Sequence, residues 1–194
     1  NKGEKALIPF ESERKYSLAI CKIENKLKVF IKGEPKTIRS FCNKILIKNK
    51  LVNFSNYDHS FTNTFEKVTN LGERPIAFAF KELDPNIYPL NFEFNLENLE
   101  FGMNEFIMVG LISLDDPPKK DIHIQIMKLK ETGVSMVMIT GDNLNTARVL
   151  ANKINFIQSN QNATLITGRD FNRALITQNF ELLNLEFRIN KSIF

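Results

Sequence analysis

Residues 136–148 read MVMITGDNLNTAR, and this stretch decides how the second half of the chain is interpreted. An apolar run with strand character stops at a threonine, a glycine and an aspartate, and the residues that follow have the spacing of a helix. A continuous apolar run of this kind is typical of a strand that is buried on both faces of a parallel sheet. We therefore predict a strand over 134–140 and a helix over 143–154.

The sequence upstream of this stretch shows the same pattern. The apolar run FIMVGLISL at 106–114 ends at two aspartates and two prolines, and 119–133 then has apolar residues at helical spacing, although three isoleucines in it also alternate. Two strand–helix pairs in succession predict parallel strands joined by right-handed crossovers. The run ATLIT at 163–167 predicts a third strand.

The first half of the chain has a different character. Apolar and β-branched residues predict several strands, two of them joined as a hairpin, and helical spacing predicts two helices. The predicted strands are 15–23, 26–33 and 75–83. The predicted helices are 37–46 and 60–72. The change of composition near residue 105 divides the chain into two predicted domains, 1–105 and 106–194.

The bulk composition excludes several functional classes. The chain has 194 residues and a net charge of +4, and its basic residues are interleaved with glutamates, which favours a solvated surface over a nucleic-acid interface. Its two cysteines lack CxxC spacing and its two histidines lie far apart, so we predict no disulfide framework and assign no metal ligand. No apolar run approaches the about 20 residues of a membrane-spanning helix. Both ends look cut, so we expect a fragment.

The predicted strand end at Thr140, Gly141 and Asp142 has residues suited to a phosphate-bearing ligand. In open parallel sheets, ligands bind beyond the carboxyl ends of the strands. A glycine lets the backbone come close to a ligand, a hydroxyl donates to a phosphoryl oxygen, and a helix N-terminus offers free N–H groups. Because a carboxylate repels phosphate, Asp142 suggests an intervening Mg²⁺ or a ribose hydroxyl. The alternative is that Asp142 or Asn143 only caps the following helix.

Five segments, in order, resemble motifs of the P-type ATPases, the cation-pumping membrane enzymes that form an aspartyl phosphate. The segments are IPFESERKYSLAI, KVFIKGEPKTI, NLGERPIAFAFKEL, VGLISLDDPPKKDI and MVMITGDNLNTARVLA. They are similar, respectively, to the family's adenine-packing strand, its KGAPE segment, the arginine-bearing stretch that follows, its DPPR segment and its TGD segment. The detail GLISLDDPPK, with LGER before it, is similar to sodium/potassium-pump-type α subunits.

The resemblance implies a fold and a function for the whole chain. The implied fold is α/β: an α+β nucleotide-binding domain with an antiparallel sheet over 1–105, then part of a phosphorylation domain with a haloacid-dehalogenase-like, Rossmannoid parallel sheet over 106–194. The implied function is the cytoplasmic, ATP-binding portion of a membrane-bound, ion-translocating ATP hydrolase. The implied partners are ATP, Mg²⁺ with ligands mostly outside this chain, and the remaining pump with its membrane helices and actuator domain; a β subunit is left open.

The resemblance also implies a purine pocket in the first domain. Phe10 would stack on adenine, with Lys15 and Ser17 beside it, and Lys32 and Gly33 would line the bottom of the pocket. Without the resemblance, Phe10 would be read as a core phenylalanine and Lys32 as a surface lysine at a turn.

In the second domain, the resemblance implies residues that handle phosphate. Thr140 would contact the transferred phosphoryl group, with Gly141 as the close backbone approach. Asp142 would lie near the ribose and phosphates or hold the geometry of the site. Asp116 and Lys119 would lie at the neighbouring strand end, near the nucleotide.

Arg74 would bridge the triphosphate or the ribose.

Four positions depart from the family pattern. Glu34 stands where KGAPE has alanine and Lys36 where it has glutamate, so the carboxylate has moved by two positions. Ser17 replaces a glutamine and removes one adenine contact. Lys119 replaces arginine, which keeps the charge but loses the planar fork.

Several elements of the family's chemistry are absent from the sequence. There is no DKTG with its phosphate-accepting aspartate, no GDGxNDxP and no TGE. Phosphoryl transfer needs a nucleophile, a metal and charge neutralisation in line, so we expect the chain to bind ATP without hydrolysing it. Two alternatives remain open, a soluble haloacid-dehalogenase-like phosphatase and a non-catalytic nucleotide-sensing domain.

Overall fold

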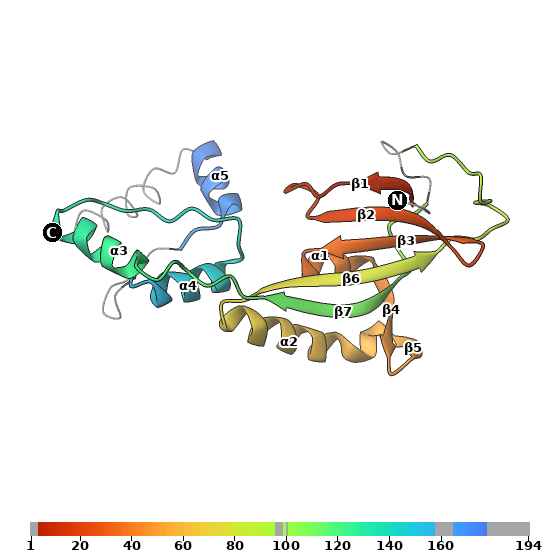
Figure 1. Cartoon of the computed structure of the whole chain (residues 1–194), viewed down its shortest axis with the longest axis horizontal. Helices are drawn as coiled ribbons and strands as arrows, with labels where there is room; N and C mark the ends of the chain where they lie inside the picture. The colour runs from red at the N-terminus through yellow and green to blue at the C-terminus, as the bar shows by residue number, and fades with distance from the viewer. Residues whose placement is uncertain (1–3, 96–98, 100, 158–164, 178–194) are drawn as a thin grey trace. The chain divides into compact units, whose positions relative to one another are not determined.

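The computed structural model describes residues 4–95, 99, 101–157 and 165–177 (Figure 1). Its contacts divide the chain into two units, unit 1 with Asn1–Lys67 and Pro75–Leu114, and unit 2 with Val68–Arg74 and Asp115–Phe194. Among the described residues, no helix combines the length and the apolar character that crossing a membrane requires.

Unit 1 is built on a sheet of seven strands in the order β1-β2-β3-β6-β7-β4-β5. The strands are β1 (Glu4–Ile8), β2 (Tyr16–Ile23), β3 (Lys26–Gly33), β4 (Cys42–Ile47), β5 (Lys50–Asn53), β6 (Arg74–Glu82) and β7 (Phe106–Leu114). β1 to β3 and β6 pair antiparallel, as do β4 and β5, whereas β4 and β7 pair in parallel. The arrows of β6 and β7 run in opposite directions in Figure 1. The α/β class is confirmed. The strand pairs within 1–105 are antiparallel, as predicted for that range, and the sheet is mixed because β7, from beyond residue 105, pairs in parallel with β4.

The hydrophobic core of unit 1 lies on one face of this sheet. Alternate residues of β3, namely Leu27, Val29 and Ile31, are at most 2% exposed, as expected when successive side chains point to opposite faces. Ile38 of α1 (Pro35–Phe41) and Phe54 of the 3₁₀ helix η1 (Phe54–Tyr57) are fully buried in the same cluster. The helix predicted over 60–72 is confirmed as α2 (Asp58–Asn70).

The predicted hairpin of β2 and β3 is confirmed, with Tyr16 opposite Gly33 at one end and Ile23 opposite Lys26 at the other. Both turn residues, Glu24 and Asn25, have positive φ angles of 51° and 57°. Two successive left-handed residues make the tight turn whose twist matches that of the flanking strands.

The helix predicted over 37–46 is wrong in its second half. α1 ends at Phe41, and β4 begins at Cys42. The apolar spacing fits a helix locally, but β4 has ladder partners on both sides, β5 antiparallel and β7 parallel. Pairing with strands distant in sequence outweighs the local preference.

The predicted strand over 106–114 forms, but in a different sheet. It is β7, and it lies between β6 and β4 in the mixed sheet of unit 1. The contacts therefore divide the chain after Leu114, whereas the composition placed the boundary near residue 105. The assignment of 1–105 and 106–194 to two functional domains stays a prediction.

The strand predicted over 134–140 is wrong for this structure, since that segment has neither helix nor strand. Val137 is 68% exposed and Ile139 92% exposed. A parallel strand needs a neighbour for its N–H and C=O groups, and β7, its predicted neighbour, pairs in unit 1 instead. The predicted strand 163–167 lies partly outside the described residues, and 165–167 have no regular structure.

Unit 2 has three helices among its described residues. The predicted helices are confirmed as α3 (Ile122–Glu131) and α4 (Leu144–Lys153), and α5 (Gly168–Ile176) follows. The turn Val68–Arg74 is held to α4 by two hydrogen bonds: Thr146 Oγ1 donates to the Glu73 carbonyl at 3.1 Å, and Lys153 Nζ donates to the Leu71 carbonyl at 3.0 Å. Both bonds lie within unit 2.

Candidate functional site

The register of β2 and β3 brings together the residues predicted for the purine pocket. Ser17 lies directly opposite Lys32, next to the pair of Tyr16 and Gly33. Directly opposite residues of an antiparallel pair point to the same face. The neighbouring pair Leu18 and Ile31 is buried in the core, so Ser17 and Lys32 lie on the other face of the sheet, where Lys32 is exposed.

Gly33 is required by a close backbone approach. A Cβ atom added at Gly33 would lie 2.3 Å from the carbonyl oxygen of Lys15, a distance at which a backbone atom must shift. That carbonyl accepts a hydrogen bond of 2.9 Å from the Glu34 N–H, and Lys15 has a left-handed φ of 63°. Gly33 therefore seats the Lys15 backbone against the end of β3.

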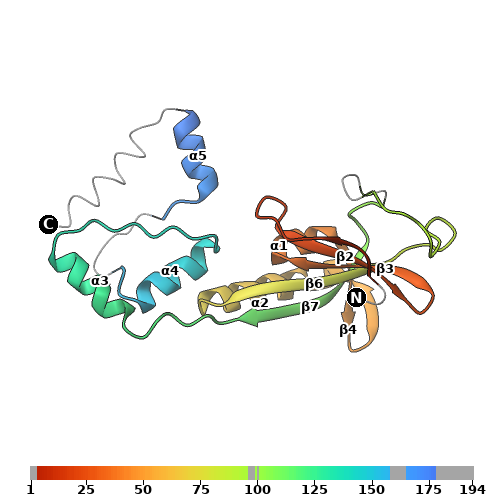
Figure 2. The same cartoon turned by 45° about the horizontal axis from the view of Figure 1, so that its top comes forward.

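Phe10 lies two residues beyond the end of β1 and is 58% exposed. Because Ile8 is opposite Leu18, the chain leaves β1 at the sheet end where Ser17 and Lys32 lie. Figures 1 and 2 both show this β1–β2 connection at the end where β3 leads into α1. The ring is not part of the core, and it is free to meet a ligand.

The two departures in KGEPK have structural roles. Glu34 is the N-cap of α1: its Oε2 accepts hydrogen bonds from the Thr37 N–H at 2.8 Å and from the Thr37 hydroxyl at 2.6 Å. The ammonium group of Lys36 lies 5.2 Å from the centroid of the Phe65 ring, within range of a cation–π contact. The relocated carboxylate therefore starts a helix, and the lysine that replaces the family's glutamate packs on α2.

The helix cap at α4 separates the roles of two adjacent residues. Asn143 is the N-cap, since its Oδ1 accepts from the N–H groups of Asn145 and Thr146 at 3.0 and 3.1 Å. Asp142 does not cap the helix. A Cβ added at Gly141 would meet nothing within 4 Å, so packing in this structure does not require a glycine there.

Asp142 instead connects two other predicted site residues, both in unit 2. One carboxylate oxygen forms an ion pair with Arg74 Nε, and the other accepts a hydrogen bond from the Thr140 hydroxyl at 3.1 Å. The Thr140 oxygen in turn accepts from the Asp142 N–H at 3.1 Å. The Asp142 side chain is 11% exposed and that of Arg74 52%. The structure thus links the three residues in one polar chain.

This arrangement stabilises the charged form of Arg74. The hydrogen bond with Asp142 raises the pKa of the Arg74 guanidinium above its ordinary value, and the charges of Asp142 and Asp116 add to the effect. Asp116 therefore lies close enough for its charge to act on Arg74. Lys119 is exposed on the segment that precedes α3, and nothing in the described structure brings it to this group.

The side chains in the described part of the chain include no cluster of three histidines, cysteines, aspartates or glutamates that would hold a metal ion. Mg²⁺ prefers several oxygen ligands in octahedral geometry. The residues present at Thr140 and Asp142 do not by themselves fit a magnesium site.

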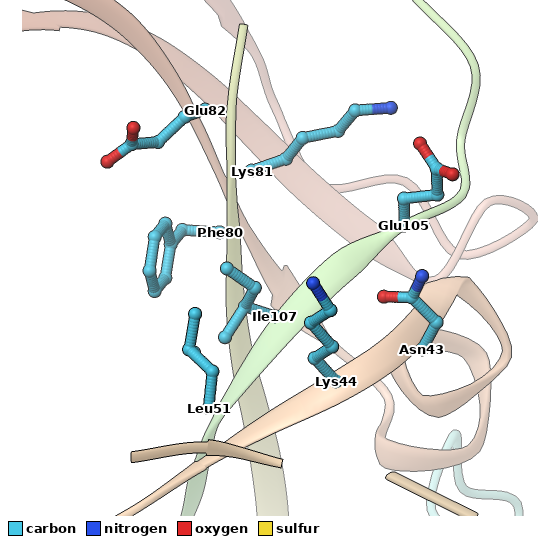
Figure 3. Close-up of a pocket in the computed structure, with 8 residues that line it drawn as sticks. All are labelled: Asn43, Lys44, Leu51, Phe80, Lys81, Glu82, Glu105 and Ile107. Carbon is cyan, nitrogen blue, oxygen red and sulfur yellow. The ribbon is translucent and has the colours of Figure 1, made fainter. Parts of the chain in front are cut away.

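A shallow hollow of about 470 Å³ lies elsewhere on unit 1 (Figure 3). Its lining includes Lys44, Leu51, Phe80, Glu105 and Ile107, from β4 to β7 and the segment before β7. In Figure 3, the side chains of Phe80, Ile107 and Leu51 lie on one side of it, and the amine of Lys44 lies beside Ile107. It shares no residue with the predicted pocket, so we locate the candidate site by strand register and not by this hollow.

The sequence did not point to Arg14. It lies in the same loop as Phe10 and Lys15, and its side chain contacts Pro9 and Glu11 of that loop. The spacing of Glu11 and Arg14 is an available signal, but it does not reveal the backbone contact that Arg14 makes.

Comparison with known proteins gives consistent matches. The sequence profile described as "P-type ATPase, cytoplasmic domain N" matches residues 1–121. Sodium/potassium-transporting ATPase subunit alpha-4 of Rattus norvegicus is 32% identical over 169 residues, covering 84% of this chain and 16% of the relative. Subunit alpha-A of Artemia franciscana is 31% identical over 153 residues, covering 77% and 15%. Potassium-transporting ATPase alpha chain 2 of Rattus norvegicus is 30% identical over 161 residues, covering 80% and 15%. The chain thus spans about one sixth of these relatives' length.

Proposed function

Because this chain belongs to the P-type cation-transporting ATPase family, we propose that it is the ATP-binding portion of a cation pump. In the whole protein, ATP hydrolysis through an aspartyl phosphate would drive cation transport across a membrane, with this portion on the cytoplasmic side. The membrane helices, the actuator domain and the phosphate-accepting aspartate would belong to the rest of the pump. A β subunit would be a further partner.

One observation carries the proposal: Phe10, Lys15, Ser17 and Lys32 lie at the same end of the sheet in unit 1, and Gly33 allows the Lys15 backbone to come close. An exposed aromatic ring offers a π-face on which a purine base stacks. Lysine ammonium groups beside it provide compact positive charge for a polyphosphate. An aromatic face next to lysines suits an adenine nucleotide better than it suits an uncharged ligand.

In unit 2, we propose that Thr140, Asp142 and Arg74 bind phosphate oxygens. Arg74 has a charged planar group suited to phosphate oxygens, and Asp142 orients it through their ion pair. Asp142 also fixes the Thr140 hydroxyl, whose donor would turn to a phosphoryl oxygen. Asp116 would stabilise the charged form of Arg74, and Gly141 would lie beside Thr140 and Asp142. Lys119 is exposed and would be a further phosphate contact.

The chain should bind ATP and leave it intact. Its sequence has no DKTG nucleophile, and in-line phosphoryl transfer requires a nucleophile and charge neutralisation together. Bound Mg²⁺ would neutralise phosphate charge, but the ligands for it would come mostly from outside this chain.

The experiment is a titration of the 194-residue chain with ATP, followed by NMR chemical shifts. We expect weak, saturable binding that Phe10→Ala weakens about tenfold, since one aromatic–base stack contributes roughly 1–3 kcal/mol. Lys32→Ala should also weaken it. Lys22→Ala is the matched control, because Lys22 is exposed near the opposite end of β2.

Unchanged ATP binding in both Phe10→Ala and Lys32→Ala would remove the pocket assignment. Release of phosphate from a phosphomonoester by the chain alone would favour the soluble phosphatase instead. That alternative has less support because the sequence has no DxD nucleophile motif before Thr140: Asp115 and Asp116 are adjacent and run into two prolines. If this chain binds ATP but the whole protein transports no cation, the nucleotide-sensing alternative would be favoured.

A further inference from the structure

The loop Pro9–Lys15 carries both predicted purine contacts of the β1–β2 connection. Pro9 and Phe10 are exposed at its start, and Lys15 is exposed at its end. A ring that is 58% exposed is not oriented by packing of its own atoms. The backbone that carries it sets the direction of its Cα–Cβ bond, so whatever fixes the loop also fixes the position from which the ring extends.

Arg14 fixes this loop from inside. Its Nη2 donates a hydrogen bond of 2.7 Å to the carbonyl oxygen of Pro9, and its Nη1 lies 3.3 Å from a carboxylate oxygen of Glu11. The Lys15 N–H donates a second cross-link of 2.7 Å to the Glu11 carbonyl. The guanidinium carbon also lies 5.6 Å from the centroid of the Tyr16 ring. The loop is therefore closed immediately before Phe10.

The position of Arg14 carries a cost that a solvated arginine avoids. Its side chain is only 26% exposed, and its Nε is buried with no hydrogen-bond partner among the described residues. A buried donor without a partner loses its hydration without compensation. An arginine extended into water would keep all its donors solvated. The conformation observed is therefore maintained by what the guanidinium does to the loop.

We propose that Arg14 is a positioning residue of the purine site, which holds Phe10 in its ligand-ready direction by binding the Pro9 carbonyl. The inference rests on the proposed nucleotide-binding function and extends it to a residue that would not touch the ligand. A loop ordered before binding loses less conformational entropy when the ligand arrives. Arg14 thus acts on affinity through Phe10.

The test is a double-mutant cycle in the 194-residue chain, with Arg14→Gln, Phe10→Ala and both together, titrated with adenosine and with ATP by NMR. We expect Arg14→Gln to lower the affinity for adenosine and the affinity for ATP by the same factor of about ten, because both ligands share the base. In the Phe10→Ala background, Arg14→Gln should have no further effect. Lys22→Gln, which removes the same charge from an exposed position on β2, should bind like wild type.

Three results would overturn the inference. Wild-type affinity in Arg14→Gln would show that the hydrogen bond from Arg14 to the Pro9 carbonyl does not affect ligand binding. A further loss of affinity when Arg14→Gln is added to Phe10→Ala would show that Arg14 does not act through Phe10. A larger loss for ATP than for adenosine would make Arg14 a phosphate contact. If Phe10→Ala alone binds both ligands normally, the purine site itself fails, which is a separate outcome. Arg14→Lys, which can still donate to Pro9, should recover part of the affinity and guards against a folding defect in Arg14→Gln.

Discussion

At the scale of single residues, Asp142 shows how one carboxylate takes part in several interactions. It pairs with Arg74, accepts from the Thr140 hydroxyl and leaves the helix cap to Asn143. Because its side chain is 11% exposed, the loss of Arg74 would leave a largely desolvated charge without its ion-pair partner.

We predict a measurable coupling between Arg74 and Asp142. Arg74→Ala should destabilise unit 2, and Asp142→Asn should cancel part of that loss, with a coupling free energy of about 1 kcal/mol, because Arg74 itself is half exposed to solvent. Urea unfolding followed by far-UV circular dichroism measures it, since the chain has no tryptophan. Strictly additive effects of the two substitutions would show that the ion pair contributes nothing to stability in solution.

The residues of the purine pocket differ in how far the sequence could predict them. The position of Lys32 and Gly33 at the end of a strand follows from the local pattern, but their assignment to a pocket came only from the family resemblance. The register of the β2–β3 hairpin places Ser17 opposite Lys32. Arg14 could not be predicted in this way, because its partner is a backbone carbonyl and its geometry depends on the path of a loop. Local pattern fixes strands more firmly than it fixes loops.

At the scale of elements, α1 begins at a proline that follows an acidic N-cap. Proline suits the first helical position, since the N–H it lacks has no partner there. The spacing of Glu34, Pro35 and Thr37 is a helix start signal, although we predicted the helix from residue 37, two residues after its first residue Pro35. The end of α1 was not readable, since Cys42–Ile47 becomes a strand only through partners that lie elsewhere in the chain.

Removal of this cap should weaken unit 1. We expect Glu34→Ala to cost about 1 kcal/mol, because the Thr37 N–H and hydroxyl lose their acceptor, and to lower the melting temperature by roughly 2–4 °C. Glu34→Asp, which retains a capping carboxylate, is the control and should stay near wild type. Equal melting temperatures of all three proteins would contradict the capping role.

The pairing of β3 and β6 should depend on pH through Glu82. Glu82 lies opposite Lys28 and accepts from it at 2.9 Å, and this hydrogen bond, together with the charges of Lys28 and Lys26, lowers the pKa of Glu82 below its ordinary 4.5. A lowered carboxyl pKa stabilises the fold above the ordinary value, and this stabilisation is lost as the pH falls through the lowered pKa.

Accordingly, wild type should be more stable than Glu82→Gln at neutral pH, and the difference should shrink progressively below pH about 4.5. Thermal melts of both proteins across this range measure it. Glu24→Gln is the control: Glu24 lies 3.8 Å from Lys28 and is 83% exposed, so its effect should be smaller. A difference that grows towards acid pH would reverse the sign and refute the assignment.

At the scale of the whole molecule, the two units differ in the types of residue that they bury. The main hydrophobic cluster lies entirely in unit 1. The buried residues described in unit 2 are small or polar, apart from one isoleucine: Thr69, Ile126, Thr146, Ala147, Ala151 and Ala174. Composition predicted a division of the chain, but it could not predict that β7 would join the first sheet, because that depends on β4 and β6 as neighbours.

Backbone amides of the two units should therefore exchange with solvent at different rates. Amides of α3 and α4 should exchange faster than those of β2 and β3, because less apolar area is buried beneath them and local opening costs less free energy. Exchange followed by mass spectrometry distinguishes the two sets of peptides. Equal protection in both sets would mean that the chain opens as one cooperative unit.

The turn Val68–Arg74 has a consequence for dissecting the chain. In sequence it lies between α2 and β6, but two of its carbonyl groups accept hydrogen bonds from Thr146 and Lys153 of α4. The polypeptide thus passes between the units three times, after Lys67, after Arg74 and after Leu114. A single proteolytic cut after Leu114 would release two pieces, neither of which corresponds to a complete unit. If the piece after Leu114 were expressed alone, Thr146 and Lys153 of α4 would lack their hydrogen-bond acceptors. A version of unit 2 that keeps these contacts would have to include the seven residues Val68–Arg74.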